Sequence, residues 1–282
     1  MLTKTWVAPP CILHDCRFAT IAALTDLQCQ WNAQDILVVP GWESRRLILG
    51  YASSDRALEA VFRLRSVVFT QELGHGSTEA RLLGIDKDKY DDQMDHIVLV
   101  DRDSHEMVGT YRVQTIAKAE KHLGIYSASE FQIEALRPFF PELAECGRAC
   151  ILPAFRKATS LFTLWAGLSS YLQLADCRWL FGCCSINSVD TDDAWKTMKT
   201  LRTLGYLNDT LVPPVAACDC GDPDLEFALD PEDALPLPKL FGAYMKLGAR
   251  VVSLPAIDRD FGTIDFLVMA DVKDLKMSSL SR

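Results

Sequence analysis

The sequence has no long hydrophobic run, although 49% of its 282 residues are hydrophobic. No apolar segment approaches the ~18 residues that a membrane-spanning helix requires, so we predict no transmembrane span. The N-terminus is not typical of a secretory signal either, because Pro9 and Pro10 interrupt its short apolar run. We therefore expect a cytoplasmic protein with one large, well-buried core.

Positive charge is also scarce: 29 Lys and Arg residues stand against 38 Asp and Glu residues, a formal net charge of −9. This balance argues against nucleic acid as a partner, because a phosphate backbone is bound by clustered positive charge. The ten cysteines include no CxxC pair, and no histidine lies near Cys218 and Cys220 in the sequence. We therefore predict no metal site and expect reduced thiols.

Three common enzyme motifs are absent: the Gly-x-Ser-x-Gly elbow, the P-loop and the dinucleotide-binding fingerprint. The segment 143–160, LAECGRACILPAFRKATS, nevertheless reads as a strand that runs into a helix, with Arg156 and Lys157 at the junction. Many α/β enzymes hold a phosphate group at such a junction, where helix amides are free. From Arg156 to Ser160 there is no glycine, which raises the question of what the junction binds.

Periodic hydrophobic patterns predict an α/β fold with a mixed central sheet of about seven strands flanked by helices. Predicted strands span 45–51, 96–101, 107–114, 143–151, 178–186, 249–255 and 263–270. Predicted helices span 53–74, 127–136, 159–176, 191–205 and 237–248. A capping box of Ser127 and Glu130 opens the helix at 127–136. Residues 1–45, with a short helix at 20–28, form an appendage; residues 46–282 form the main domain, in which 206–236 is a long irregular connection.

One arginine falls in the middle of an apolar helix stripe. At about 100° per residue, Arg65 lies on the buried face with Leu58, Phe62 and Phe69, whereas Arg63 points away. Such an arginine either pairs with a carboxylate of the protein and fixes the helix to the sheet, or it meets a carboxylate of a substrate or of a site acid. The sequence leaves both interpretations open.

An acidic run follows this helix. The segment DKDKYDDQMD carries five aspartates within ten residues: Asp86, Asp88, Asp91, Asp92 and Asp95. It is not a calcium-binding loop, because the central glycine and the terminal glutamate are missing. We expect most of these carboxylates to be solvated in a loop, and one or two to be available to a cationic substrate.

Two strands place charged residues among apolar ones. Alternation puts Arg112 with Val108 and Gln114 on one face of its strand. Glu145 and Arg148 lie in a strand otherwise suited to burial. A glutamate in such a position either pairs with an arginine or serves as a base. These motifs alone give a cluster of arginines and acids without naming a reaction.

Taken together, these segments resemble a known family, the N-acyltransferases of bacterial ornithine-lipid synthesis, a hemolysin-like branch of the GNAT superfamily. The resemblance rests on the runs RLRSVVFTQELG, DKDKYDDQMDH, GTYR, YSASEFQI, ECGRACILPAFR, LFGCCSI and LPKLFGAYMKLGARVVSLPAIDRDFGTIDFLV, which occur in the family's order. It covers roughly residues 46–272 and is most specific in the C-terminal block. The chain is more distantly similar to acyl-homoserine lactone synthases, which share the GNAT core.

The resemblance implies a GNAT fold and transfer of a 3-hydroxylated acyl chain to the α-amine of L-ornithine, giving a lyso-ornithine lipid. It implies catalytic roles for Glu145, as the base that takes the amine proton, and for Arg148. The arginines would hold the substrate carboxylate or order the acids, and Asp88 or Asp91 would bind the side-chain ammonium. The substrate-binding residues implied are Arg65, Phe69, Asp88, Asp91 and Arg112.

The missing glycines bear on the donor. GNAT enzymes that use coenzyme A usually have a glycine-containing loop around the pyrophosphate, whereas RKATSL has Thr159 and Leu161 in those places. An acyl carrier protein presents a single phosphate on its phosphopantetheine arm, so a simpler site suffices; acyl-CoA is the other candidate donor. No cofactor is expected to be bound permanently. We expect the donor to be bound by Ile151, Arg156, Lys157, Thr159 and Ser160.

Two alternatives remain open at this level. The first keeps the chemistry and changes the amine, giving an N-acyl amino acid or a homoserine lactone; the second is a non-catalytic carrier-binding module. Peripheral contact with a membrane, to deliver the product, also stays open. The expected lining of an apolar slot for the acyl tail is Phe131, Phe139, Phe140, Trp165 and Phe181.

Overall fold

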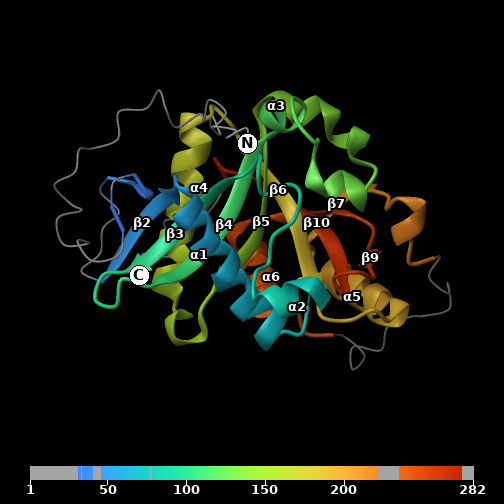
Figure 1. Ribbon diagram of the computed structural model, residues 1–282. Coiled ribbons are helices and arrows are strands. Elements are labelled where there is room, and N and C mark those ends of the chain that lie inside the picture. The colour runs from blue at the N-terminus through green and yellow to red at the C-terminus, as the bar shows by residue number, and fades with distance from the viewer. Residues whose placement is uncertain (1–30, 33, 41–45, 76–77, 222–234, 275–282) are drawn as a thin grey trace, which may run out of the picture.

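The computed structural model describes residues 31–32, 34–40, 46–75, 78–221 and 235–274. The predicted helix at 20–28 lies outside these residues. A central sheet runs through the molecule, with helices on both of its faces (Figure 1). Its strands are β1 Ile36–Val38, β2 Leu47–Ala52, β3 Asp95–Asp101, β4 Met107–Thr115, β5 Leu143–Ile151, β6 Trp179–Ile186, β7 Leu207–Val212, β8 Arg250–Ser253, β9 Ala256–Asp258 and β10 Thr263–Asp271.

The strand order is β1-β2-β3-β4-β5-β6-β10-β8-β7, with β9 paired to β10. The pairs β5–β6 and β7–β8 are parallel and the other pairs antiparallel, so the predicted mixed α/β sheet is confirmed. The predicted number of about seven strands is too low, because the described residues form ten. The extra strands, β1, β7 and β9, are three to six residues long and show no sustained alternation of apolar and polar residues. β1 pairs with β2, so the sheet extends upstream of residue 46.

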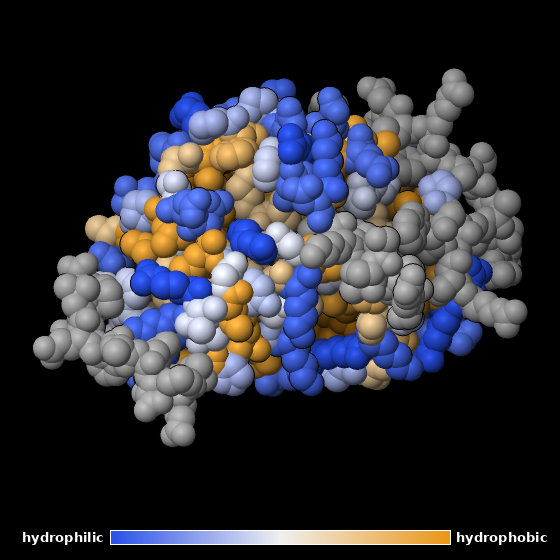
Figure 2. All heavy atoms as spheres, turned by 180° about the vertical axis from the view of Figure 1, so that it is seen from behind, coloured by the Kyte–Doolittle hydropathy of each residue, from blue (hydrophilic) through white to orange (hydrophobic). Residues whose placement is uncertain are grey.

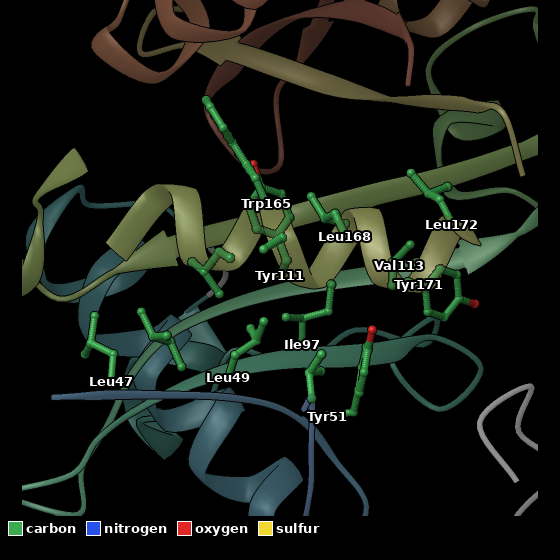
Figure 3. Close-up of a cluster of buried hydrophobic side chains, with 14 of the residues drawn as sticks. Leu47, Leu49, Tyr51, Ile97, Tyr111, Val113, Trp165, Leu168, Tyr171 and Leu172 are labelled. Carbon is green, nitrogen blue, oxygen red and sulfur yellow. The ribbon is translucent and has the colours of Figure 1, made fainter. Parts of the chain in front are cut away.

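The helices cover the two faces of the sheet because neighbouring strand residues point in opposite directions. Ile48 packs with α1 on one face, and its neighbour Leu49 packs with α4 on the other. Figure 3 shows α4 lying across β2, β3 and β4, with the ring of Tyr171 on the side of the strands, 6.4 Å from the ring of Tyr51. The main helices are α1 Asp55–Arg65, α2 Thr78–Leu83, α3 Ile116–Ala119, α4 Ala158–Leu174, α5 Thr191–Thr203 and α6 Lys239–Leu247.

The predicted helix at 127–136 is wrong. Two 3-10 helices occupy this region, η4 Tyr126–Ser129 and η5 Ile133–Glu142, and Pro138 and Pro141 lie inside the second. The expected capping box does not form, because the Ser127 hydroxyl donates to Glu145 at 2.7 Å. Ser127 and Glu130 instead contact residues of other elements: Ser127 contacts Glu145 of β5, and Glu130 contacts Asp265 of β10.

The sheet opens between β5 and β6. These strands pair in parallel only over Leu143–Glu145 and Trp179–Phe181. Just beyond this pairing, a Cβ on Gly182 would lie 2.2 Å from the carbonyl oxygen of Cys146. The sequence therefore requires glycine at this position for the strands to approach before they separate.

A bulge in β5 adds to the opening. Thr110 of β4 lies opposite Cys150 and Arg112 lies opposite Gly147, so β5 carries two residues where β4 carries one. One of the two is Arg148, whose φ of 50° is in the left-handed region. Bulges redirect side chains and concentrate near functional sites.

The outer surface is mixed in character. The face shown in Figure 2 carries patches of hydrophobic residues among hydrophilic ones. Within the described part of the chain, no helix is both long enough and apolar enough to cross a membrane.

Candidate active site

A cavity of about 440 Å³ lies where β5 and β6 separate. Its lining divides into a polar and an apolar group, so one cavity can receive both a charged and a hydrophobic ligand. The polar group includes Arg112, Tyr126, Glu145, Arg148, Thr263 and Asp265. The apolar group includes Trp165, Leu168, Leu172, Leu180, Tyr244 and Leu247.

An arginine–aspartate network stands beside the polar group. The helix α1 ends at Arg65, which is fully buried and donates to Asp86 and, at 2.6 Å, to Asp91. Arg112 of β4 donates to Asp88 at 2.6 Å and to Asp91 at 3.0 Å. Each buried cation therefore has carboxylate partners within the protein, as burial of a charge requires.

Asp91 is the centre of this network. Burial alone would raise the pKa of its carboxyl group, but Arg65 and Arg112 outweigh that effect and hold the pKa well below its usual range. Its Oδ2 also accepts from the backbone amide of Asp88 at 2.7 Å. The expectation of a solvated loop is wrong for Asp91 and Asp86, which are buried.

His96 lies against the same carboxylate and stays neutral. Burial lowers its pKa to about 4, against the opposing effect of Asp91. The Nε2 atom lies 3.3 Å from the backbone oxygen of Asp91, which can only accept, so the ring carries its proton on Nε2. With three arginines, three aspartates and a neutral histidine, the network is close to neutral overall.

Arg148 is held less tightly than its neighbours. Its closest carboxylate contact is to Asp88, at 3.3 Å, and its guanidinium lies over the rings of Tyr126 and Phe261 at 5.2 and 4.8 Å. The Nε atoms of Arg148 and Arg112 are buried without a hydrogen-bond partner. Buried donors are rarely left unpaired, so these two are suited to an acceptor group of a ligand.

Phe261 reaches the site from the turn between β9 and β10. Asp258 accepts hydrogen bonds from the amides of Asp260 and Phe261, and Gly262 completes the turn with φ 82°. The ring stacks on His75 at 5.1 Å and meets Phe69 edge-on at 5.9 Å. This turn is the DRDFG part of the C-terminal block.

Glu145 lines the cavity with both carboxylate oxygens already occupied. Oε1 accepts from the amide and the hydroxyl of Ser127, both at 2.7 Å. Oε2 accepts from Gln114 at 2.8 Å and from the amide of Tyr126 at 3.0 Å. Glu145 therefore fixes the turn that carries Tyr126, and a proton can reach it only where one donor gives way.

The predicted donor site lies at the end of β5 and the start of α4. Arg156 forms a bidentate ion pair with Glu72, at 2.5 and 2.6 Å, and also donates to the backbone oxygen of Ile151. Lys157 is exposed at the N-cap position of α4 and makes no side-chain cap. Thr159 is exposed and Ser160 is buried. The amide of Ser160 donates to the carbonyl oxygen of Lys157 at 3.1 Å, so the amides of Ala158 and Thr159 are the ones at this end that can receive an anion.

Two of the five residues that we expect to line an acyl slot lie at this cavity. Trp165 and Phe181 line the cavity. Phe131, Phe139 and Phe140 do not, because they pack in the hydrophobic cluster under η5. In Figure 3, Trp165 points away from β2 and β3, and the structure places it 5.5 Å from Tyr244 of α6.

Comparisons with known proteins bear on this site. A family model described as an acetyltransferase (GNAT) domain matches residues 64–166. An L-ornithine N(alpha)-acyltransferase of Rhizobium meliloti (strain 1021) is 30% identical over 246 residues, which cover 78% of this chain and 78% of that protein. The chain belongs to the L-ornithine N(alpha)-acyltransferase family. A second such protein, from Brucella abortus (strain 2308), is 29% identical over 251 residues, covering 82% of this chain and 86% of the relative.

A solved structure of an N-acyl amino acid synthase from uncultured soil microbes is also similar. It is 11% identical, with a TM-score of 0.46, and covers 83% of this chain and 94% of that one.

For this member of the L-ornithine N(alpha)-acyltransferase family, the structure brings together most of the residues predicted from sequence. Arg65, Asp88, Asp91, Arg112 and Arg148 form one network, and Phe69, Arg112, Glu145 and Arg148 line the cavity. Arg65, Asp88 and Asp91 do not line it, and neither do Ile151, Arg156, Lys157, Thr159 and Ser160. The residues that the sequence predictions missed are Tyr126, Ser127, Glu130, Phe261 and Asp265.

Proposed function

We propose that this protein transfers a long, 3-hydroxylated acyl chain from the thioester of an acyl carrier protein to the α-amine of L-ornithine, giving a lyso-ornithine lipid. The observation that carries the proposal is the divided lining of the cavity at the β5–β6 opening. The polar part of the lining includes two arginines whose buried Nε donors have no acceptor. The apolar part forms a slot that can hold an acyl chain. Membership of the L-ornithine N(alpha)-acyltransferase family supports the choice of ornithine.

The acceptor's carboxylate is assigned to Arg148 and Arg112. Both residues line a cavity that is otherwise largely apolar, and the Nε donor of each has no hydrogen-bond partner. A charge-assisted hydrogen bond is strong in such surroundings. The rings of Tyr126 and Phe261 hold the Arg148 guanidinium between them. Arg65 does not line the cavity and acts as a positioning residue, because its partner Asp91 also holds Arg112.

The reaction requires the α-amine to lose its proton. At neutral pH an amine with a pKa of about 8 or above is mostly protonated. As its nitrogen attacks the thioester carbon, the N–C bond forms, the C–S bond breaks, and the thiolate leaves with one proton. Glu145 remains our candidate for the base that takes the other proton, with the Ser127 hydroxyl as the donor that turns aside.

We assign the acyl donor to the edge of β5 that faces β6. Beyond Glu145 the strand no longer pairs with β6, so backbone amides near Ala149 are available to polarise the thioester carbonyl. The N-terminus of α4, with Lys157, would meet the phosphate of the phosphopantetheine arm. Because Glu72 and Ile151 already hold Arg156, we assign Arg156 to ordering this loop and not to direct phosphate contact.

Peripheral membrane contact also stays a prediction. It is supported by two leucines of α2, Leu82 and Leu83, which are 82% and 60% exposed. Leu73, at the end of the preceding π-helical turn Ser66–Glu72, is 42% exposed and lines the cavity. A product with an acyl chain would leave the cavity close to these side chains.

The test is an assay with 3-hydroxyacyl carrier protein, matched acyl-CoA and a panel of amino acids, in which released thiol and product mass are measured. We expect thiol release with ornithine and the carrier-bound donor. Release with tyrosine and not ornithine would change only the acceptor, and release with acyl-CoA alone would change only the donor. If no combination of donor and acceptor releases thiol, the proposed acyltransferase activity is refuted.

The role of Glu145 is tested separately. As a base, it is typically worth ~10²–10⁴-fold in rate. We expect Glu145→Gln to lower single-turnover rates by a factor in this range with little change in the KM for ornithine. Ser127→Ala, which removes one donor and leaves the carboxylate, is the matched control and should lose far less. If both variants lose the same rate and the same stability, Glu145 is a positioning residue only.

A further inference from the structure

Three side chains from distant parts of the chain meet beside the cavity, outside the arginine network. They are Glu130 after η4, Cys183 on β6 and Asp265 on β10, whose polar side-chain atoms all lie within 4.8 Å of one another. Glu130 and Asp265 are each 4% exposed. Asp265 and Cys183 line the cavity, whereas Glu130 is not part of its lining. The proposed function so far uses none of the three.

Asp265 lines the cavity, and its Oδ1 atom is buried without a hydrogen-bond partner. The groups of the protein that can donate to this carboxylate are the hydroxyls of Ser185 and Thr263 and the carboxyl group of Glu130. No ion pair within the described part of the chain includes Asp265 or Glu130. A buried acceptor in this state is suited to a donor that arrives with a ligand.

The charge of this pair fits a cation. Burial and the neighbouring Asp265 carboxylate raise the pKa of Glu130 to about 9, and Asp258 acts in the same direction. Burial raises the pKa of Asp265 as well, but hydrogen bonds from Ser185, Glu130 and Thr263 oppose that effect. Glu130 therefore keeps its proton at neutral pH, and we assign the negative charge of the pair to Asp265, the member that lines the cavity. Arg148 opposes these effects on Glu130, which places the guanidinium within electrostatic reach of the pair.

We propose that Asp265, backed by Glu130, binds the side-chain ammonium of the amino-acid acceptor and so selects a diamino acid. The proposal rests on the proposed function and deepens it. With the acceptor's carboxylate at Arg148 and its ammonium at Asp265, the two ends of a short zwitterion meet opposite charges across one cavity. The prediction that Asp88 or Asp91 binds this ammonium is less favourable, because both carboxylates already hold arginines.

The first test compares acceptors on the wild-type protein. Ornithine and norvaline have the same number of side-chain carbons and differ in the terminal ammonium, so norvaline is the matched neutral acceptor. A hydrogen bond to a charged group contributes about 1.5–3 kcal/mol, which corresponds to roughly 10- to 150-fold in kcat/KM. We expect ornithine to be preferred over norvaline by a factor in this range. Equal kcat/KM for the two acceptors would overturn the proposal without touching the acyl transfer itself.

The second test uses Asp265→Asn. This variant should lose the preference for ornithine while its kcat/KM for norvaline stays within about threefold of wild type. A merely structural role would lower both acceptors equally, and that result would overturn the proposal. Asp209→Asn, on an exposed part of β7, is the control and should retain the preference. Glu130→Gln should give a smaller loss in the same direction, because Glu130 acts through Asp265.

Two further measurements separate the remaining outcomes. Calorimetric binding of ornithine and norvaline without a donor tests the ammonium site even if no acyl transfer occurs, and we expect Asp265→Asn to weaken ornithine only. The purified protein is also analysed for metal. One equivalent of a divalent ion that Asp265→Asn removes would assign Glu130, Cys183 and Asp265 to a metal instead, and would overturn the proposal.

Discussion

The neutral His96 makes the stability of this protein depend on pH in a predictable way. The folded state holds the pKa of His96 at about 4, below the ordinary value of 6.5 that it regains on unfolding. Between these values the unfolded chain binds a proton that the folded chain refuses, so the free energy of unfolding falls as the pH falls from 6.5 toward 4. The stabilising effect is fully present above pH 6.5.

The size of the effect follows from the two pKa values. Going from pH 7 to pH 5, the linkage relation gives a loss of about 2 kcal/mol from this one residue. Replacement by glutamine, His96→Gln, removes the titrating group and keeps a side-chain donor for the backbone oxygen of Asp91. We therefore expect urea unfolding of wild type to lose about 2 kcal/mol more between pH 7 and pH 5 than unfolding of the variant does.

The control is His122→Gln at an exposed position, which should follow wild type at both pH values. Few carboxylates titrate between pH 7 and pH 5, so the difference between the two variants isolates His96. If wild type and His96→Gln lose the same stability over this range, the burial of a neutral imidazole beside Asp91 is refuted.

Three further predictions concern the opening and the cavity. Gly182→Ala should lower the free energy of unfolding in urea by about 1–3 kcal/mol, because its Cβ would lie 2.2 Å from the Cys146 oxygen. The control is Gly242→Ala, whose Cβ meets only Leu237 at 4.0 Å and which should leave the stability unchanged. Equal losses for the two variants would contradict the close approach of β5 and β6. Arg148→Lys keeps the charge and removes the Nε donor, so the KM for ornithine should rise by roughly tenfold or more with little change in thermal unfolding. Ser169→Phe puts a ring into the cavity lining on α4, so steady-state assays should show transfer of long acyl chains falling by roughly tenfold or more while acetyl transfer persists. Equal losses for long and short chains would remove this helix face from the acyl slot.

The local patterns of the sequence were sufficient for most of the fold. The apolar stripe of α1 predicts that Arg65 is buried and Arg63 is exposed, and the structure places them so. Alternation predicts the long strands, because a strand that is buried on one or both faces must show it in its own residues. The short strands β1, β7 and β9 have too few residues to carry such a pattern.

The partners of the buried polar groups were decided only by the tertiary structure. Sequence patterns show that Arg65 needs a carboxylate, but not that Asp86 and Asp91 turn inward to supply it. The spacing of Ser127 and Glu130 fits a helix cap. In the structure, however, Ser127 binds Glu145 and Glu130 binds Asp265, which is far along the chain.

The physical reason is a difference in range. Periodicity records which face of an element is buried, and that depends on neighbouring residues in the sequence. A buried charge needs a counter-charge or a hydrogen-bond partner, and the tertiary fold decides which strand or turn supplies that partner. The sequence by itself therefore determined the α/β framework, the buried arginines and the family resemblance. Only the packing of β5, β6 and β10 decided where the cavity lies and which groups face it.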